Sequence, residues 1–236
     1  MLIFAGKFTD CMKKLTVLFV AALLAIPAFA QHERSSSAVA SFADGAVTLD
    51  IINHTSFSYG FVKSDAFVAK GSGEVSLNVL GLDFYPSPSF GIESGLDCKW
   101  QIAGSRESVF GLFNNIPQVL PVTDTAVDER MSSLTAFSLT VPVFAKFYLG
   151  KWFLGGGAEA NFNLTTFTDS MIRKDNVRIV TTETKGKARL FTYDLAGMIG
   201  YEDLALIGKF YPKHNCFVPD GGVQFNTWTL GVIFFL

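Results

Sequence analysis

The end of the chain constrains its fold more than any other feature. From Trp228 to Leu236 every second residue is apolar, and the alternating positions Thr227, Thr229 and Gly231 are small or polar. A period of two puts the apolar side chains on one face of a β-strand. This pattern is typical of a transmembrane β-barrel strand, with lipid outside and a packed polar lumen inside. A terminal strand of a soluble sheet is the alternative, and the usual aromatic ending of such barrels is missing because Leu236 follows Phe235.

The start of the chain predicts export. Lys13-Lys14 precede an apolar run at 15–26, and Ala28-Phe29-Ala30 offers a small-x-small cleavage site. The run is too short for a membrane helix. We therefore predict a cleaved signal peptide over residues 1–30, with the true start at Met12.

Removal of the signal peptide leaves one domain with a mildly acidic charge. The mature part carries 16 basic and 20 acidic side chains, a net charge of −4 that does not suit a nucleic-acid-binding protein. Its two cysteines, Cys98 and Cys216, come from distant parts of the predicted sheet, so we expect free thiols. We assign residues 31–45 to an N-terminal periplasmic segment and 46–236 to a barrel, although composition alone also allows a soluble β-sandwich.

Eight segments alternate with period two. The predicted strands cover residues 46–62, 74–85, 89–102, 134–149, 152–166, 189–201, 204–212 and 224–236. Eight is the smallest strand number of a closed transmembrane barrel, so we predict an all-β fold, a closed eight-stranded antiparallel transmembrane β-barrel. The second segment changes parity, which a β-bulge near Val79 would explain. In the fifth, Leu154 has the lipid-facing parity and Asn161 the opposite one, so we expect Asn161→Ser to be nearly silent.

The connections between these segments alternate in length. Short links at 86–88, 150–151 and 202–203 alternate with long ones at 63–73, 103–133, 167–188 and 213–223. Outer-membrane barrels have tight periplasmic turns and longer outer loops. We expect both termini in the periplasm. Aromatic residues near strand ends predict two interfacial girdles, Tyr85, Phe90, Trp152 and Tyr201 by the short turns and Trp100, Phe167, Phe191 and Phe210 by the long loops.

Eight charged residues have the inward parity. They are Asp50, Glu93, Asp97, Lys99, Lys146, Glu159, Asp194 and Lys209. An unpaired charge out of water is costly, so we expect a salt-bridged plug that fills the lumen. A narrow polar pore or a ligand cavity is the alternative.

The Gly150-Lys151 turn sets the partners of two of these charges. A turn centred between its two residues places Lys146 opposite Gly155 and Glu159 opposite Pro142. Lys146 and Glu159 are then too far apart to pair directly, and each needs a partner across the lumen. The candidates are Asp50, Glu93, Asp97 and Asp194 for Lys146, and Lys99 and Lys209 for Glu159.

Enzyme motifs are largely missing. Gly91-Ile-Glu-Ser-Gly95 lacks the order of a nucleophile elbow and lies within a strand. The histidines His32, His54 and His214 lack metal-ligand spacing. We predict no catalytic residue, cofactor or metal, although His54 with Ser56 or Ser58 could serve an interfacial lipid enzyme.

The loop at 167–188 is mildly basic. It carries Arg173, Lys174, Arg178, Lys185 and Lys187 against Asp169, Asp175 and Glu183. Such a loop can be simply solvated, or it can contact the anionic groups of lipopolysaccharide.

Two hairpins carry a resemblance to a known family. The first hairpin runs from Leu139 to Leu149, through the following turn, and from Trp152 to Ala160. The second runs from Gly200 to Tyr211 and continues into the final strand. Both resemble small outer-membrane β-barrel domains common in Bacteroidota, the PorT-like barrels. The resemblance implies fold and location but no enzymatic role.

These observations favour a non-enzymatic integral protein of the Gram-negative outer membrane with a structural, adhesion or envelope-interaction role. A small, porin-like transport barrel is the alternative, followed by a lipid-modifying enzyme. The expected partners are outer-membrane lipids and lipopolysaccharide, with the barrel-assembly machinery engaged through the C-terminal strand.

Overall fold

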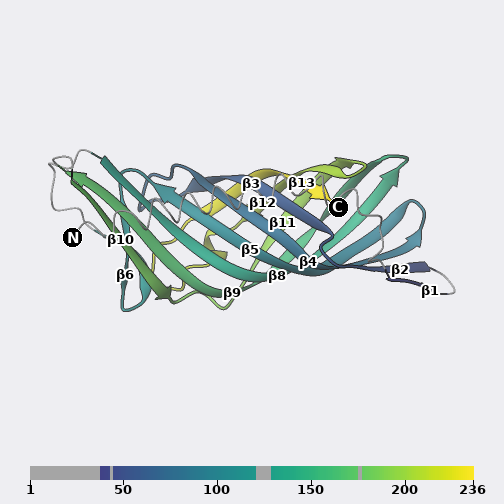
Figure 1. Cartoon of the computed structure of the whole chain (residues 1–236), viewed down its shortest axis with the longest axis horizontal. Helices are drawn as coiled ribbons and strands as arrows, with labels where there is room; N and C mark the ends of the chain where they lie inside the picture. The colour runs from purple at the N-terminus through teal and green to yellow at the C-terminus, as the bar shows by residue number, and fades with distance from the viewer. Residues whose placement is uncertain (1–37, 43–44, 121–128, 175–176) are drawn as a thin grey trace.

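A closed ring of antiparallel strands dominates the computed structural model, which describes residues 38–42, 45–120, 129–174 and 177–236. In these ranges eight strands pair around the ring, and β13 pairs back onto β3. The predicted all-β, eight-stranded architecture is confirmed (Figure 1). The ring consists of β3 (His54–Lys63), β4 (Ser72–Ser87), β5 (Phe90–Ser105), β8 (Glu129–Leu149), β9 (Trp152–Lys174), β11 (Phe191–Tyr201), β12 (Leu204–Tyr211) and β13 (Asn226–Phe235). The predicted signal peptide, with its start at Met12, lies outside the described residues.

The first predicted strand is wrong as a single element. It divides into β2 (Gly45–Asp50) and β3, separated by three residues. Ile52 between them has φ 57°, an uncommon conformation for a β-branched residue that interrupts strand pairing. β2 still pairs along β4, and β1 (Ala38–Phe42) pairs with β2 as an added hairpin.

The predicted bulge in the second segment is confirmed. The register between β4 and β5 shifts between Asn78 and Leu80. A bulge reverses the parity of the residues on its C-terminal side. Glu74 and Asn78 are therefore buried inside the ring, whereas Leu82 beyond the bulge is exposed on the outside.

The two ends of the barrel differ, as the connection lengths predict. Pro88-Ser89, Gly150-Lys151 and Glu202-Asp203 form the short turns. Gly150 has φ 64°, which glycine adopts without strain. The long connections lie at the opposite end, and Figure 1 shows β6 and β10 there, while the β1–β2 hairpin and the C-terminus lie by the short turns.

Two of the predicted long loops contain regular structure. β8 and β9 extend far beyond their predicted ends, and β10 (Val177–Gly186) pairs with the extension of β9. A separate hairpin of β6 (Val109–Phe113) and β7 (Ile116–Leu120) lies in the connection between β5 and β8. Backbone pairing does not require alternating side chains, so the strands continue where the period-two pattern fades.

Helical structure is slight. The turn of 3-10 helix η1 (Lys213–Asn215) follows β12. No helix within the described residues is long and apolar enough to cross a membrane.

Buried apolar side chains form two clusters inside the ring. The layer near the short turns consists of Phe144, Phe153, Met198, Ala205, Ile207 and Ile233. The layer near the long loops consists of Phe67, Ala103, Phe110, Leu134, Ala136, Cys216, Phe217, Val218, Val223 and Phe225. We call them the turn-side layer and the loop-side layer.

Candidate functional site: the lumen charge network

The centre of the lumen is charged. On β8, Phe144 belongs to the turn-side layer and Leu134 to the loop-side layer. Ser138 lies between them and is the cross-strand partner of Lys99. The Lys99 side chain therefore lies between the two apolar layers, fully buried.

Lys99 and Lys209 join three carboxylates in a central cluster. Both ammonium groups contact Glu159, Lys209 with a distance of 2.7 Å from Nζ to Oε1. Lys209 also lies 2.6 Å from Glu74, and Lys99 lies 3.1 Å from Asp194. These five side chains are all at most 3% exposed.

Neutral groups complete the central cluster. Asn161 donates a hydrogen bond to Asp194 at 2.9 Å and accepts one from Thr140 at 2.8 Å. The Tyr211 hydroxyl donates to Glu74. Asn161 is fully buried, so the structure argues against the expectation that Asn161→Ser is silent, since serine would leave the Asp194 carboxylate without this donor.

A second cluster, the turn-side cluster, lies nearer the short turns. Lys146 forms an ion pair with Glu93. The imidazole of His54 lies between two carboxylates, with Nδ1 3.7 Å from Glu93 and Nε2 3.6 Å from Asp97. Asp97 also accepts a hydrogen bond of 2.7 Å from Asn78.

Seven of the eight charges expected in the lumen thus fall in the two clusters. Asp50 is the exception, because it lies half-buried on β2, outside the ring. The register of the β8–β9 hairpin is as predicted, with Lys146 opposite Gly155 and Glu159 opposite Pro142.

Three members of the clusters were missed by the sequence analysis: Glu74, His54 and Tyr211. A parity signal was present for each. Glu74 alternates with Val75 on β4, His54 shares the parity of Ser56, and Tyr211 shares that of Lys209.

The structure does not favour the alternative in which His54 and Ser56 or Ser58 serve an enzyme. Both His54 nitrogens face carboxylates inside the ring. Within the described residues no group of three or more His, Cys, Asp or Glu side chains is arranged to hold a metal ion. The described cysteines, Cys98 and Cys216, are free thiols, the second of them buried.

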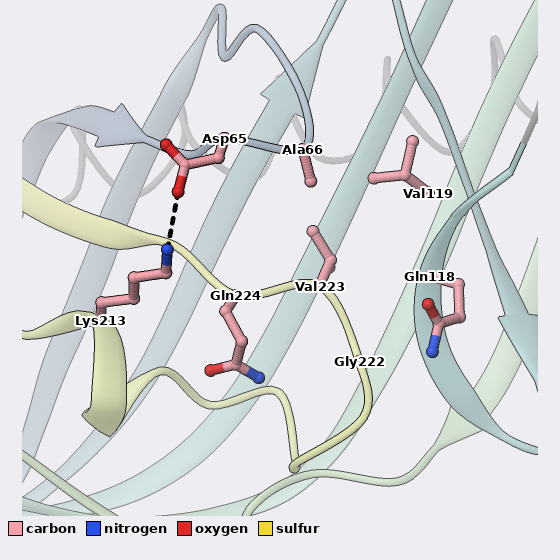
Figure 2. Close-up of a pocket in the computed structure, with 8 residues that line it drawn as sticks. All are labelled: Asp65, Ala66, Gln118, Val119, Lys213, Gly222, Val223 and Gln224. Carbon is pink, nitrogen blue, oxygen red and sulfur yellow. Dashed lines mark hydrogen bonds and ion pairs between the residues drawn. The ribbon is translucent and has the colours of Figure 1, made fainter.

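A recess opens between the long loops on the outer side of the loop-side layer. It has a volume of about 350 Å³ and is lined by Asp65, Ala66, Gln118, Val119, Lys213, Gly222, Val223 and Gln224 (Figure 2). Lys213 lies 2.8 Å from Asp65 across its rim, and this ammonium group holds the pKa of Asp65 below its usual value. The recess is lined by both charged and aliphatic groups.

Comparisons with known proteins add little. No family model and no curated protein sequence matches the chain. Two crystal structures of Ail, the attachment invasion locus protein of Yersinia pestis, are similar at 12% and 10% identity, with TM-scores of 0.37 and 0.34. Each match covers 82% of this chain and 99% of the Ail chain, and the first Ail structure is a complex with the heparin analogue sucrose octasulfate. These TM-scores are too low to carry a conclusion about this chain.

Proposed function

We propose that the chain is a non-enzymatic integral protein of the outer membrane, with a structural, adhesion or envelope-interaction role. The proposal rests on the contrast between the apolar outer face and the charged inner face of the barrel wall. Outside, Leu154, Leu195 and Leu230 are 51%, 52% and 60% exposed. Inside, Lys99 and Asp194 are both 0% exposed. This is the inverse of a soluble protein, and it suits a wall surrounded by lipid, in which a closed sheet satisfies every backbone group.

Burial of the charges supports a sealed plug rather than a pore. A water-filled channel would leave its lining accessible to solvent, whereas the residues of both clusters are at most 6% exposed. The two apolar layers lie on either side of the central cluster. A lipid-modifying enzyme is disfavoured because His54 faces carboxylates within this closed space.

We place the interacting role at the ends of the barrel. Lys185 and Lys187 are exposed beside β10 and would be available to the anionic groups of lipopolysaccharide. The strand β13, with its outward Trp228 and Leu230, suits recognition by the barrel-assembly machinery. Family membership among the PorT-like barrels is part of the proposal and rests on the hairpin sequences.

Fractionation and heat-modifiable gel migration test the location. The mature protein should partition with the outer membrane and migrate differently before and after boiling, since a closed barrel resists detergent until it is heated. Recovery of the mature protein from the soluble periplasm would contradict the proposal.

Conductance in planar bilayers tests the plug. The purified protein should give no steady ion current, and a variant with the central ion pairs removed, Lys99→Met with Lys209→Met, serves as the matched comparison. A steady current through the wild-type protein would favour the transport alternative.

A further inference from the structure

The buried charges of the lumen do not balance. Among the described side chains of the two clusters, five carboxylates face three lysines. The carboxylates are Glu74, Glu93, Asp97, Glu159 and Asp194, and the lysines are Lys99, Lys146 and Lys209. Two negative charges are therefore left over in a space that excludes water. Asp83, opposite Glu93 on β4, is only half-buried and accepts a hydrogen bond from the Tyr85 hydroxyl, so solvent and this donor stabilise its charge.

His54 supplies one compensating charge by its position. Carboxylates only accept hydrogen bonds, and a neutral imidazole has one donor nitrogen and one acceptor nitrogen. Here Nδ1 faces Glu93 and Nε2 faces Asp97, both within 4 Å. A neutral ring would aim a lone pair at one carboxylate. The doubly protonated ring suits both and leaves the turn-side cluster of His54, Lys146, Glu93 and Asp97 neutral.

Of the three carboxylates in the central cluster, Asp194 is the least stabilised as an anion. Its Oδ2 atom accepts hydrogen bonds from Lys99 and Asn161. Its Oδ1 atom is buried, and no donor among the described residues lies within hydrogen-bond distance. Lys209 forms its ion pairs with Glu159 and Glu74. An unbonded hydroxyl costs less in a dry site than an unbonded anionic oxygen.

We propose that the sealed lumen holds two protons at neutral pH, one making His54 an imidazolium and one on Asp194. The inference rests on the closed plug of the proposed function. It makes the barrel sensitive to alkaline pH, because loss of either proton leaves an uncompensated negative charge beside Glu93 and Asp97 or beside Glu159 and Glu74. The lysines that face these groups, Lys146 and Lys99 with Lys209, are already engaged by other carboxylates.

Proton release on unfolding tests the proposal. The folded protein in detergent micelles is unfolded with guanidinium chloride at pH 7.5, and the protons released are counted. At this pH an unfolded histidine and an unfolded aspartate are mostly deprotonated. His54→Gln and Asp194→Asn should each release about one proton fewer than the wild type, and the double variant about two fewer.

Exposed residues outside the lumen provide the matched controls. His214→Gln and Asp220→Asn should release as many protons as the wild type, since both side chains are exposed. Equal release from the wild type and the lumen variants would overturn the proposal. If a lumen variant does not fold, ¹⁵N NMR of the wild-type protein decides, because both ring nitrogens of His54 should carry protons at pH 7.5 and a single protonated nitrogen would refute the imidazolium. A steady bilayer current would instead identify failure of the sealed plug.

Discussion

The lysines of this protein differ in how deeply their ion pairs are buried. Lys209 is 2% exposed and joins Glu74 to Glu159. Lys209→Met would leave these two carboxylates short of a counter-charge in a dry lumen. We expect a loss of about 3–5 kcal/mol in the free energy of unfolding, measured by urea titration in micelles.

Lys151 offers the matched control for this loss. Its ion pair with Glu202 lies in the turn region, with side chains 65% and 47% exposed. Lys151→Met should leave the urea midpoint nearly unchanged because water screens exposed pairs. Equal losses in the two variants would show that the lumen is wet.

Cys216 gives a pH-dependent prediction outside the membrane. It lies in the loop between β12 and β13, where burial raises the pKa of its thiol to about 11. The thiolate is the reactive species, so reaction with a disulfide reagent should be slow at pH 8 and accelerate as the pH approaches 11. The measurement uses the mature protein with Cys98 replaced by serine. Fast reaction of the folded protein at pH 8 would contradict the buried position.

At the scale of single elements, β9 shows the two faces of the wall. Leu154 is 51% exposed on the outward face. Leu154→Arg should reduce membrane insertion, since a charge on the lipid face costs free energy that rises with depth, to about 2–4 kcal/mol at the bilayer midplane. Leu190→Arg is the control, because Leu190 is 72% exposed in the connection between β10 and β11. The measurement is the folded fraction in lipid vesicles, and equal folding of both variants would mean that the outward face of β9 does not contact lipid.

The strands also show where the period-two sequence pattern predicts structure and where it does not. The period-two pattern located every ring strand, because lipid on one side and a packed lumen on the other dictate alternation. It missed residues 129–133 of β8, residues 167–174 of β9 and the strand β10, where the alternation fades. It also merged β2 with β3, since the positive φ of Ile52 has no signature in the alternation.

The orientation of the whole molecule can be tested with two cysteines. Lys187→Cys lies at the long-loop end and Lys151→Cys at the short-turn end, and both native side chains are exposed. In intact cells a maleimide that cannot cross the outer membrane should label residue 187 alone. Residue 151 should react only after the outer membrane is permeabilised. Labelling of residue 151 in intact cells would reverse the proposed orientation.

The sequence by itself determined the strand count, the faces of the strands, the alternation of turns and loops, and the register of the β8–β9 hairpin. These properties are local, because they depend on alternation within a strand or on a turn of two residues. The same local reasoning placed Lys146 and Glu159 too far apart to pair across their hairpin, as the structure has them.

Only the tertiary structure decided which charges meet. Lys209 and Glu74 belong to strands on different parts of the ring, and their contact depends on how far each strand is displaced along its neighbour until the ring closes. That displacement accumulates over the pairings of β12 with β13, β13 with β3 and β3 with β4, so no single segment encodes it. The position of His54 between Glu93 and Asp97 depends on two successive pairings, because β3 and β5 both pair with β4. Alternation alone could only assign the three residues to the same interior.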